Sequence, residues 1–251
     1  MQPNAVLESL LAHRSVRAYS DRPLPGDLLE TLVAAGQSAS TSSHLQAWSV
    51  VAVEDPARKA RLSTLASGQS HVAKAPLLLV FLADLSRLRG LGDAQGLPGD
   101  GLGYLESLVI GVADAALAAQ NMVVALESLG LGCCYIGAMR NQPEAVAEEL
   151  ALPPECFAVF GLTVGYPDPD VAIAVKPRLP QAMVLHREVY APAPISSFAE
   201  FDERMQAFQR GQYMPEAGWT TSVAARVRGP DAMAGRHRLQ AALKRLGFGL
   251  Y

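Results

Sequence analysis

The sequence has few cysteines and little clustered charge. Its 251 residues include three cysteines, Cys133, Cys134 and Cys156, an odd number with one adjacent pair. This makes a poor disulfide framework and favours a reducing compartment. No spacing of cysteine and histidine resembles a zinc site. Charged residues make up 18% and the net charge is −3. Because no run is rich in lysine and arginine, DNA or RNA binding is not expected.

Several familiar signatures are also missing. There is no Walker-type phosphate loop and no HExxH motif. Gly130-Leu131-Gly132 begins like a dinucleotide fingerprint, but Tyr135 stands where the third glycine belongs, so these glycines are expected to end a helix and allow a tight turn. His44 follows a run of serine and threonine without a nucleophile elbow, which argues against a hydrolase. The N-terminus has no basic region followed by a long apolar core, so no signal peptide is expected, and the cytoplasm is the predicted location.

Hydrophobic residues are abundant, at 50% of the chain, which is typical of a compact enzyme or an obligate oligomer. The segment from Leu105 to Leu129 is apolar enough to raise the question of a membrane span. It contains Glu106, Asp114 and Glu127, and charges at such depths are costly in lipid. We therefore expect a long buried helix that can supply a subunit interface, and no membrane association.

Apolar periodicity, β-branched runs and turn residues predict the elements of secondary structure. The continuous apolar run 76–82 predicts a central strand buried on both faces. Residues 84–100 are rich in glycine and predict a mobile loop, whereas 166–194 are rich in proline and predict an extended segment. The other expected strands are 48–53, 133–136 and 157–164, and the expected helices are 4–13, 27–35, 56–65, 105–129, 143–150 and 198–208, with two short ones around Ser222 and Leu239.

Two basic segments carry the strongest chemical signal: His13-Arg14-Ser15-Val16-Arg17 and Lys176-Pro177-Arg178. Arg14 and Arg17 are three residues apart and can share one side of a turn, and the proline stiffens the second segment. If the two segments meet, they form a site rich in donors for a phosphate and an electron-rich ring. Taken singly, each is also compatible with ordinary surface cations.

Two further donor-rich patches lie between these segments, at Ser40–Gln46 and at Tyr135-Ile136-Gly137-Ala138. The four patches, in this order, resemble the nitroreductase family, in particular its larger NADPH-dependent oxygen-insensitive nitroreductases and flavin reductases. The resemblance extends through Gly68-Gln69, His71-Val72-Ala73, Glu127–Gly132, Arg140-Asn141 and Arg210-Gly211.

The resemblance implies an α+β fold, with a mixed, mainly antiparallel sheet flanked by helices. It also implies an intertwined homodimer with FMN at the interface. Residues 1–195 would form the FMN-binding core, and residues 196–251 would form a C-terminal helical extension with a loop that faces the cofactor.

The activity implied by the resemblance is FMN-dependent and NADPH-driven, with two-electron ping-pong transfer to nitroaromatic or quinone acceptors. Arg14, Ser15, Lys176 and Arg178 would bind the FMN phosphate. The proposed catalytic residues are Arg17, beside the N1–C2 edge of the flavin, and Gly137, whose backbone would approach N5. The remaining flavin-binding set comprises His13, Thr41, Gln69, Tyr135, Ile136 and Ala138. Structural alternatives are helix capping by Ser15 and Thr41 and a core position for Tyr135.

Arg210 matches an arginine thought to hold the extra phosphate of NADPH in this subgroup. The sequence departs from the subgroup just downstream, where Met214, Pro215 and Glu216 replace further arginines, so a weaker NADPH preference is expected. A solvated loop arginine is the alternative. Two other functions stay open: an NAD(P)H:FMN reductase that hands reduced flavin to a partner, and a flavin-binding protein without turnover.

Overall fold

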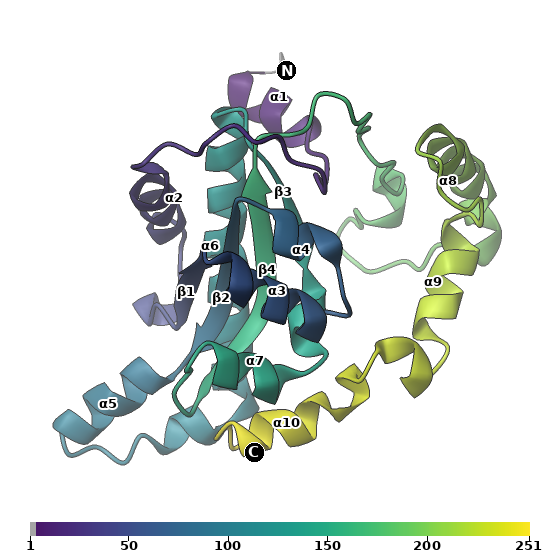
Figure 1. The fold of residues 1–251 in the computed structure, drawn as a ribbon. Coiled ribbons are helices and arrows are strands. Elements are labelled where there is room, and N and C mark those ends of the chain that lie inside the picture. Colours follow the sequence, from purple (N-terminus) through teal and green to yellow (C-terminus); the bar gives the residue numbers. More distant parts are fainter. Residues whose placement is uncertain (1–3) are drawn as a thin grey trace. The chain divides into compact units, whose positions relative to one another are not determined.

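The computed structural model describes residues 4–251, and its contacts group them into two compact units (Figure 1). The first unit comprises the chain up to Val171 together with Gly235–Tyr251, and the second is Ala172–Ala234. The strands are β1 (Trp48–Val53), β2 (Leu77–Asp84), β3 (Gly132–Ile136) and β4 (Cys156–Gly165). The α-helices are α1 (Ala5–Leu11), α2 (Leu28–Gln37), α3 (Pro56–Leu65), α4 (Ser70–Lys74), α5 (Ser86–Ala94), α6 (Leu105–Ser128), α7 (Pro143–Glu149), α8 (Ala199–Gly211), α9 (Trp219–Val227) and α10 (Leu239–Arg245).

The four strands form one sheet in the order β1-β2-β4-β3, and every pair of neighbouring strands is antiparallel. β2 is one of the two inner strands and is buried along its whole length, which confirms the central strand predicted from its apolar run. Among residues 4–251, the parallel element that a mixed sheet requires is one bridge outside the named strands, between Ser15 and Cys133.

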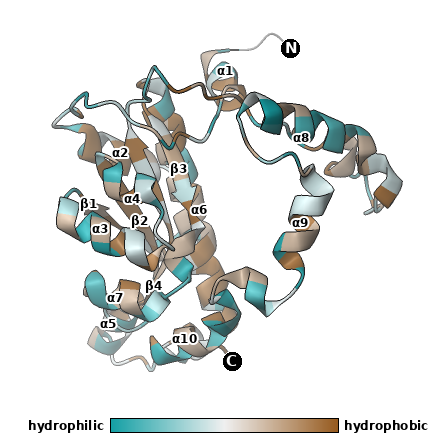
Figure 2. Cartoon of the chain, turned by 45° about the vertical axis from the view of Figure 1, so that its right-hand side comes forward, coloured by the Kyte–Doolittle hydropathy of each residue, from teal (hydrophilic) through white to brown (hydrophobic). Residues whose placement is uncertain are grey.

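The two faces of the sheet carry separate hydrophobic cores, because successive side chains of a strand point to opposite faces. On one face, Leu79 and Phe81 of β2 pack with α2 and α6. On the other face, Leu78 and Val80 pack with residues of α3, α4 and α7. Figure 2 shows the hydrophobic colouring concentrated on the strands and on α6. The sheet therefore divides the first unit into an α6 side and an α4 side.

The segment after α1 is extended and runs beside β3. The amide of Val16 donates to the carbonyl of Cys133 at 2.8 Å, and the Tyr19 hydroxyl donates to the carbonyl of Val16 at 2.8 Å. The same hydroxyl lies 2.6 Å from Thr163 Oγ1 on β4. The expected turn shared by Arg14 and Arg17 is therefore wrong, because pairing with the sheet edge holds this segment extended.

The glycines after α6 have different tasks. Gly130 has a φ of +76°, the left-handed conformation that ends helices, as expected. At Gly132, a Cβ would lie 2.9 Å from the Cβ of Val16. The missing side chain at Gly132 thus lets the first basic segment, residues 13–17, lie close against β3.

Among the described residues, α6 is long and apolar enough to cross a membrane by length and composition. Its inward face is buried against the sheet of its own unit, at positions that include Leu108, Ala115, Met122 and Leu126. This confirms the predicted core helix. The outer face keeps Val109 and Leu117 exposed.

Residues 84–100 contradict the expected loop, because Ser86–Ala94 form α5. Leu85 and Leu88 join the core, and the guanidinium of Arg89 forms two hydrogen bonds with the carboxylate of Glu155, at 2.9 and 2.7 Å. These tertiary contacts outweigh the low helix propensity of the two glycines in this helix. The short α4 was also not predicted, whereas the extended character of 166–194 is confirmed apart from a turn at 168–171, a 3₁₀ turn at Gln181–Met183 and a bend at 187–189.

The second unit contains α8 and α9 after its extended segment. Asp202 of α8 accepts hydrogen bonds from the amides of Trp219 and Thr220 at 2.6 and 2.8 Å, so its carboxylate satisfies the free amides at the start of α9. Trp219 also stacks on Phe198. The expected domain boundary after residue 195 stays a prediction.

Replacing Gly132 with alanine should destabilise the protein, because the new methyl group must displace Val16 from β3. Overpacking of this kind costs about 1–3 kcal/mol of unfolding free energy. Chemical denaturation would measure it, with Gly26→Ala as the control, since no atom lies within 4 Å of a Cβ at position 26. Equal stability of the two variants would contradict the proposed close approach.

Candidate functional site

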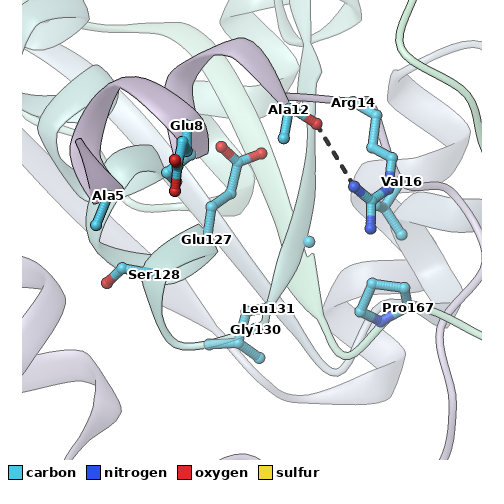
Figure 3. A pocket seen from close by; sticks show the side chains of 12 residues that line it. Ala5, Glu8, Ala12, Arg14, Val16, Glu127, Ser128, Gly130, Leu131 and Pro167 are labelled. Atoms are coloured by element: carbon cyan, nitrogen blue, oxygen red, sulfur yellow. Dashed lines mark hydrogen bonds between the residues drawn. The ribbon is translucent and has the colours of Figure 1, made fainter. Parts of the chain in front are cut away.

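The basic segment presents its residues alternately to the two sides of the sheet edge. Arg14 and Val16 line a hollow of about 450 Å³ that also contains residues of α1 and of the end of α6 (Figure 3). Ser15 and Arg17 are absent from this lining, as the period of two in an extended segment requires. Arg14 and Arg17 therefore serve different surroundings.

His13 is fixed by a carboxylate. Its Nδ1 lies 2.7 Å from Glu127 Oε1, near the end of α6. Figure 3 shows Glu127 and Glu8 on neighbouring sides of the hollow, with Arg14 across from them. Because a carboxylate only accepts hydrogen bonds, Nδ1 carries the proton in this pair, and Nε2 is the ring nitrogen left for another partner.

Arg17 lies on the α4 side, near His71. Burial, and then the positive charge of Arg17, lower the pKa of His71, so its imidazole is neutral at neutral pH. His71 Nε2 is buried without a hydrogen-bond partner. A cation and an unsatisfied ring nitrogen therefore stand close together at the edge of the sheet.

Gly137 follows β3 and begins a short 3₁₀ turn, Gly137–Arg140. A Cβ at this position would lie 3.3 Å from Arg140 Nη2 and 3.8 Å from Arg236 Nη1, so two guanidiniums border the glycine. The side chain of Asn141 donates to Ser67 Oγ at 2.7 Å, which ties this turn to the one before Gln69. Ile136 and Ala138 are buried in the α4-side core.

Tyr135 is partly exposed and meets Phe160 edge to face, with ring centroids 5.2 Å apart. Phe160 packs against the α6-side core, so the Tyr135 ring lies on that side. Ile136 and Ala138 instead face the α4 side, where Arg17 and His71 lie.

The loop from Thr41 to Gln46 is organised by a buried carboxylate. Asp114 of α6 is 1% exposed, and its two oxygens accept from the amides of Ser42 and Ala47, each at 3.0 Å. The loop contains Ser43, His44 and Gln46 at positive φ, a strained conformation for residues other than glycine. Thr41 Oγ1 is buried without a hydrogen-bond partner.

This loop does not join the other patches within one chain. Asp114 and Ala47 belong to the α6 side of the sheet, whereas His71 and Gly137 lie on the α4 side. Thr41 is consequently separated from Arg17 by the sheet.

The remaining predicted residues lie in the second unit. Lys176 and Arg178 border a hollow of about 450 Å³ lined by Phe201, Met205 and Trp219. Arg210, at the end of α8, lies 3.3 Å from Glu216. The meeting of the two basic segments stays a prediction, because they belong to different units.

The three cysteines are all buried thiols. Burial raises the pKa of Cys133 above its usual range and that of Cys156 to about 12. Since the thiolate is the reactive form, neither of these two residues suits a nucleophilic role.

Sequence reasoning missed several residues that shape the site: Asp114, Glu127, His71 and Arg140. Asp114 gave a usable signal, because a carboxylate inside an apolar helix needs a specific partner. The others stood within motifs, but their partners are remote in sequence.

Replacing Asp114 with asparagine should destabilise the loop, because an amide group cannot accept from both Ser42 and Ala47. One buried amide is left unsatisfied, at a cost of about 1–3 kcal/mol. Chemical denaturation and limited proteolysis of the 41–46 loop would measure the effect. The control is Asp27→Asn, at an exposed residue whose side chain forms no cap hydrogen bond. Unchanged stability and unchanged cleavage would show that Asp114 does not hold the loop.

Comparison with known proteins accounts for nearly the whole chain. The model of the nitroreductase family matches residues 10–98 and 105–166, and the model of the C-terminal domain of that family matches residues 176–251. The chain is 43% identical to the FMN reductase (NADPH) of Bacillus subtilis over 74% of this chain and 75% of that protein. It is 39% identical to the oxygen-insensitive NADPH nitroreductase of Salmonella typhimurium, over 86% and 88%. The solved structure of NfrA2 from B. megaterium superposes with a TM-score of 0.92 at 34% identity, covering 99% of this chain and all of that one. The chain belongs to the nitroreductase family.

Proposed function

We propose that this protein is an FMN-dependent NADPH oxidoreductase that reduces nitroaromatic or quinone acceptors by two-electron ping-pong transfer. Relatives that match most of the chain are named FMN reductase and oxygen-insensitive NADPH nitroreductase. The observation that carries the proposal is the gathering of Arg17, His71 and Gly137 around β3. A cation, an unsatisfied ring nitrogen and a residue without a side chain suit a flat, electron-rich ligand.

The residues present fit a bound flavin. His71 Nε2 and Thr41 Oγ1 are buried polar atoms without partners, and buried polar atoms normally have one. A flavin ring, with its carbonyl oxygens and ring nitrogens, offers the missing hydrogen bonds. When bound, FMN takes up a hydride from NADPH and passes two electrons to the acceptor.

The proposed roles are those that the resemblance to the family implies, and the charge and surroundings of each residue support them. Arg17 supplies positive charge where the ring gains electrons, and the backbone of Gly137 lies against the ring edge, flanked by Tyr135, Ile136 and Ala138. Gln69 and Thr41 supply polar contacts. For the phosphate, we propose Arg14 and Ser15 together with the cations Lys176 and Arg178, and His13 remains in the flavin-binding set.

We further propose a homodimer. Thr41 lies across the sheet from Arg17, so a flavin site that uses both draws Thr41 from a second copy of the chain. The apolar face of α1, with Val6, Leu10 and Leu11, is exposed, as is the outer face of α6. A second copy that covers these faces would remove apolar surface from water. Three buried thiols agree with a cytoplasmic location.

A second candidate is a flavin reductase that releases reduced FMN, favoured by the name of the relative in B. subtilis. The two functions differ in the fate of the reduced cofactor. Turnover of a nitroaromatic without added FMN supports the oxidoreductase, whereas turnover that requires free FMN supports the reductase.

The role of Arg17 can be tested with Arg17→Ala. The phosphate-binding residues remain, so the variant should copurify with about one FMN per subunit. Its reduction by NADPH should slow by roughly 100- to 1,000-fold, the loss typical when a group that stabilises developing charge is removed. Anaerobic bleaching of the flavin measures this rate, and Arg17→Lys, which keeps the charge, is the control. Reduction of FMN and of nitrofurazone at the parent rate would refute the role.

The dimer predicts a single sedimenting species of twice the chain mass at micromolar concentration, because the flavin site needs both chains. Sedimentation velocity, followed at the absorbance of the flavin, measures the mass of the assembly and the fraction of chains that carry FMN in one experiment. A monomer with full flavin occupancy would rule the proposal out.

Arg210 is proposed to bind the 2′-phosphate of NADPH, which NADH lacks. Arg210→Ala should raise the KM for NADPH by roughly fivefold, the value of one exposed charge contact, and leave that for NADH nearly unchanged. Steady-state kinetics with both donors decides it. Equal losses for the two donors, or none, would exclude a phosphate-binding role.

A further inference from the structure

Arg210 already has an anionic partner inside its own unit. Its Nη2 lies 3.3 Å from Glu216 Oε2, and the two side chains are 65% and 45% exposed. Arg210 occupies the last turn of α8, and Glu216 stands in the loop that follows. Both groups are open to solvent, so an incoming anion can reach the guanidinium.

The loop is built so that Glu216 stays beside Arg210. The amide of Met214 donates to the carbonyl of Gln209 at 2.8 Å. The amides of Ala217 and Gly218 both donate to Gln209 Oε1 at 3.1 Å, and Gln209 is buried. Gln209, which precedes Arg210 in sequence, therefore holds the backbone on both sides of Glu216 by hydrogen bonds.

We propose that Glu216 is a specificity-determining residue that competes with the 2′-phosphate of NADPH for Arg210. This inference rests on the proposed role of Arg210. With NADH or no nucleotide, the carboxylate keeps the guanidinium. With NADPH, the phosphate takes over the guanidinium, and Glu216 is left near a second anion.

The competition is asymmetric. A phosphate ester carries up to two negative charges and three acceptor oxygens at neutral pH, whereas the carboxylate carries one charge. An exposed ion pair contributes little, because water and salt screen it. The phosphate can therefore displace Glu216, but NADPH binds more weakly than it would to an unpaired arginine. NADH brings no phosphate to this site, so its binding leaves the pair intact.

Glu216→Gln tests the inference, because it removes the charge and keeps the shape. The KM for NADPH should fall roughly three- to fivefold at low salt, and the ratio of the KM values for NADH and NADPH should rise by the same factor. The matched control is Glu200→Gln, an exposed glutamate in the first turn of the same helix, which should leave the ratio unchanged.

A binding measurement separates charge competition from effects on turnover. Calorimetric titration of the FMN-loaded enzyme with adenosine 2′-monophosphate should show tighter binding to Glu216→Gln by the same factor. Titration with adenosine should show no change. In the Arg210→Ala background, Glu216→Gln should tighten binding of the 2′-monophosphate much less, since the shared cation is gone and only direct repulsion between the two anions is relieved.

The outcomes distinguish the proposed role of Arg210 from the proposed competition by Glu216. If Arg210→Ala selectively weakens NADPH but Glu216→Gln strengthens neither NADPH nor adenosine 2′-monophosphate, the competition is wrong and the role of Arg210 stands. If Arg210→Ala affects both donors equally, both ideas fail. An equal gain for NADPH and NADH in Glu216→Gln would also overturn the competition.

Discussion

The candidate site depends on the seating of one extended segment against the edge of the sheet. The backbone hydrogen bond from Val16 to Cys133 sets the register, two more join Ser20 to Tyr166 and Asp168 to Ala18, and the bare backbone at Gly132 makes room for the Val16 side chain. Once this register is set, alternation of side chains sends Arg14 toward α1 and Arg17 toward α4. A shift by one residue would exchange them. The Tyr19 hydroxyl, held between Val16 and Thr163, fastens the far end of the segment.

A second constraint acts on the other face. Asp114 holds the 41–46 loop by two backbone amides and keeps three residues at positive φ. A buried carboxylate costs free energy unless its oxygens are satisfied. The loop amides satisfy them, so the core of α6 and the polar loop stabilise each other. The same helix holds His13 through Glu127, and α6 therefore positions two of the four donor-rich patches.

The sequence predicts most elements because their signals are local. The apolar run of β2, the proline at the start of α7 and the glycine after α6 each act within a few residues. α5 could not be predicted in this way, since Leu85, Leu88 and the Arg89–Glu155 pair stabilise it from outside.

The candidate site likewise has a part that the sequence predicts and a part that depends on the fold. Its residue types were recognisable through their resemblance to a family. The pairing of Ser15 with Cys133, of Asp114 with Ser42 and of His13 with Glu127 joins residues 72 to 118 positions apart, which no local pattern encodes. Arg210 and Glu216 are close in sequence, but their pairing requires the fold of the Gln209 loop.

The burial of the cysteines has a consequence for chemical self-damage. Quinones, one of the proposed acceptor classes, are electrophiles that add to thiolates. Cys133 and Cys156 have pKa values raised by burial, and Cys134 is enclosed on the same strand as Cys133. A quinone at the flavin would therefore meet no exposed cysteine of this chain, so arylation of a protein thiol does not compete with its reduction there.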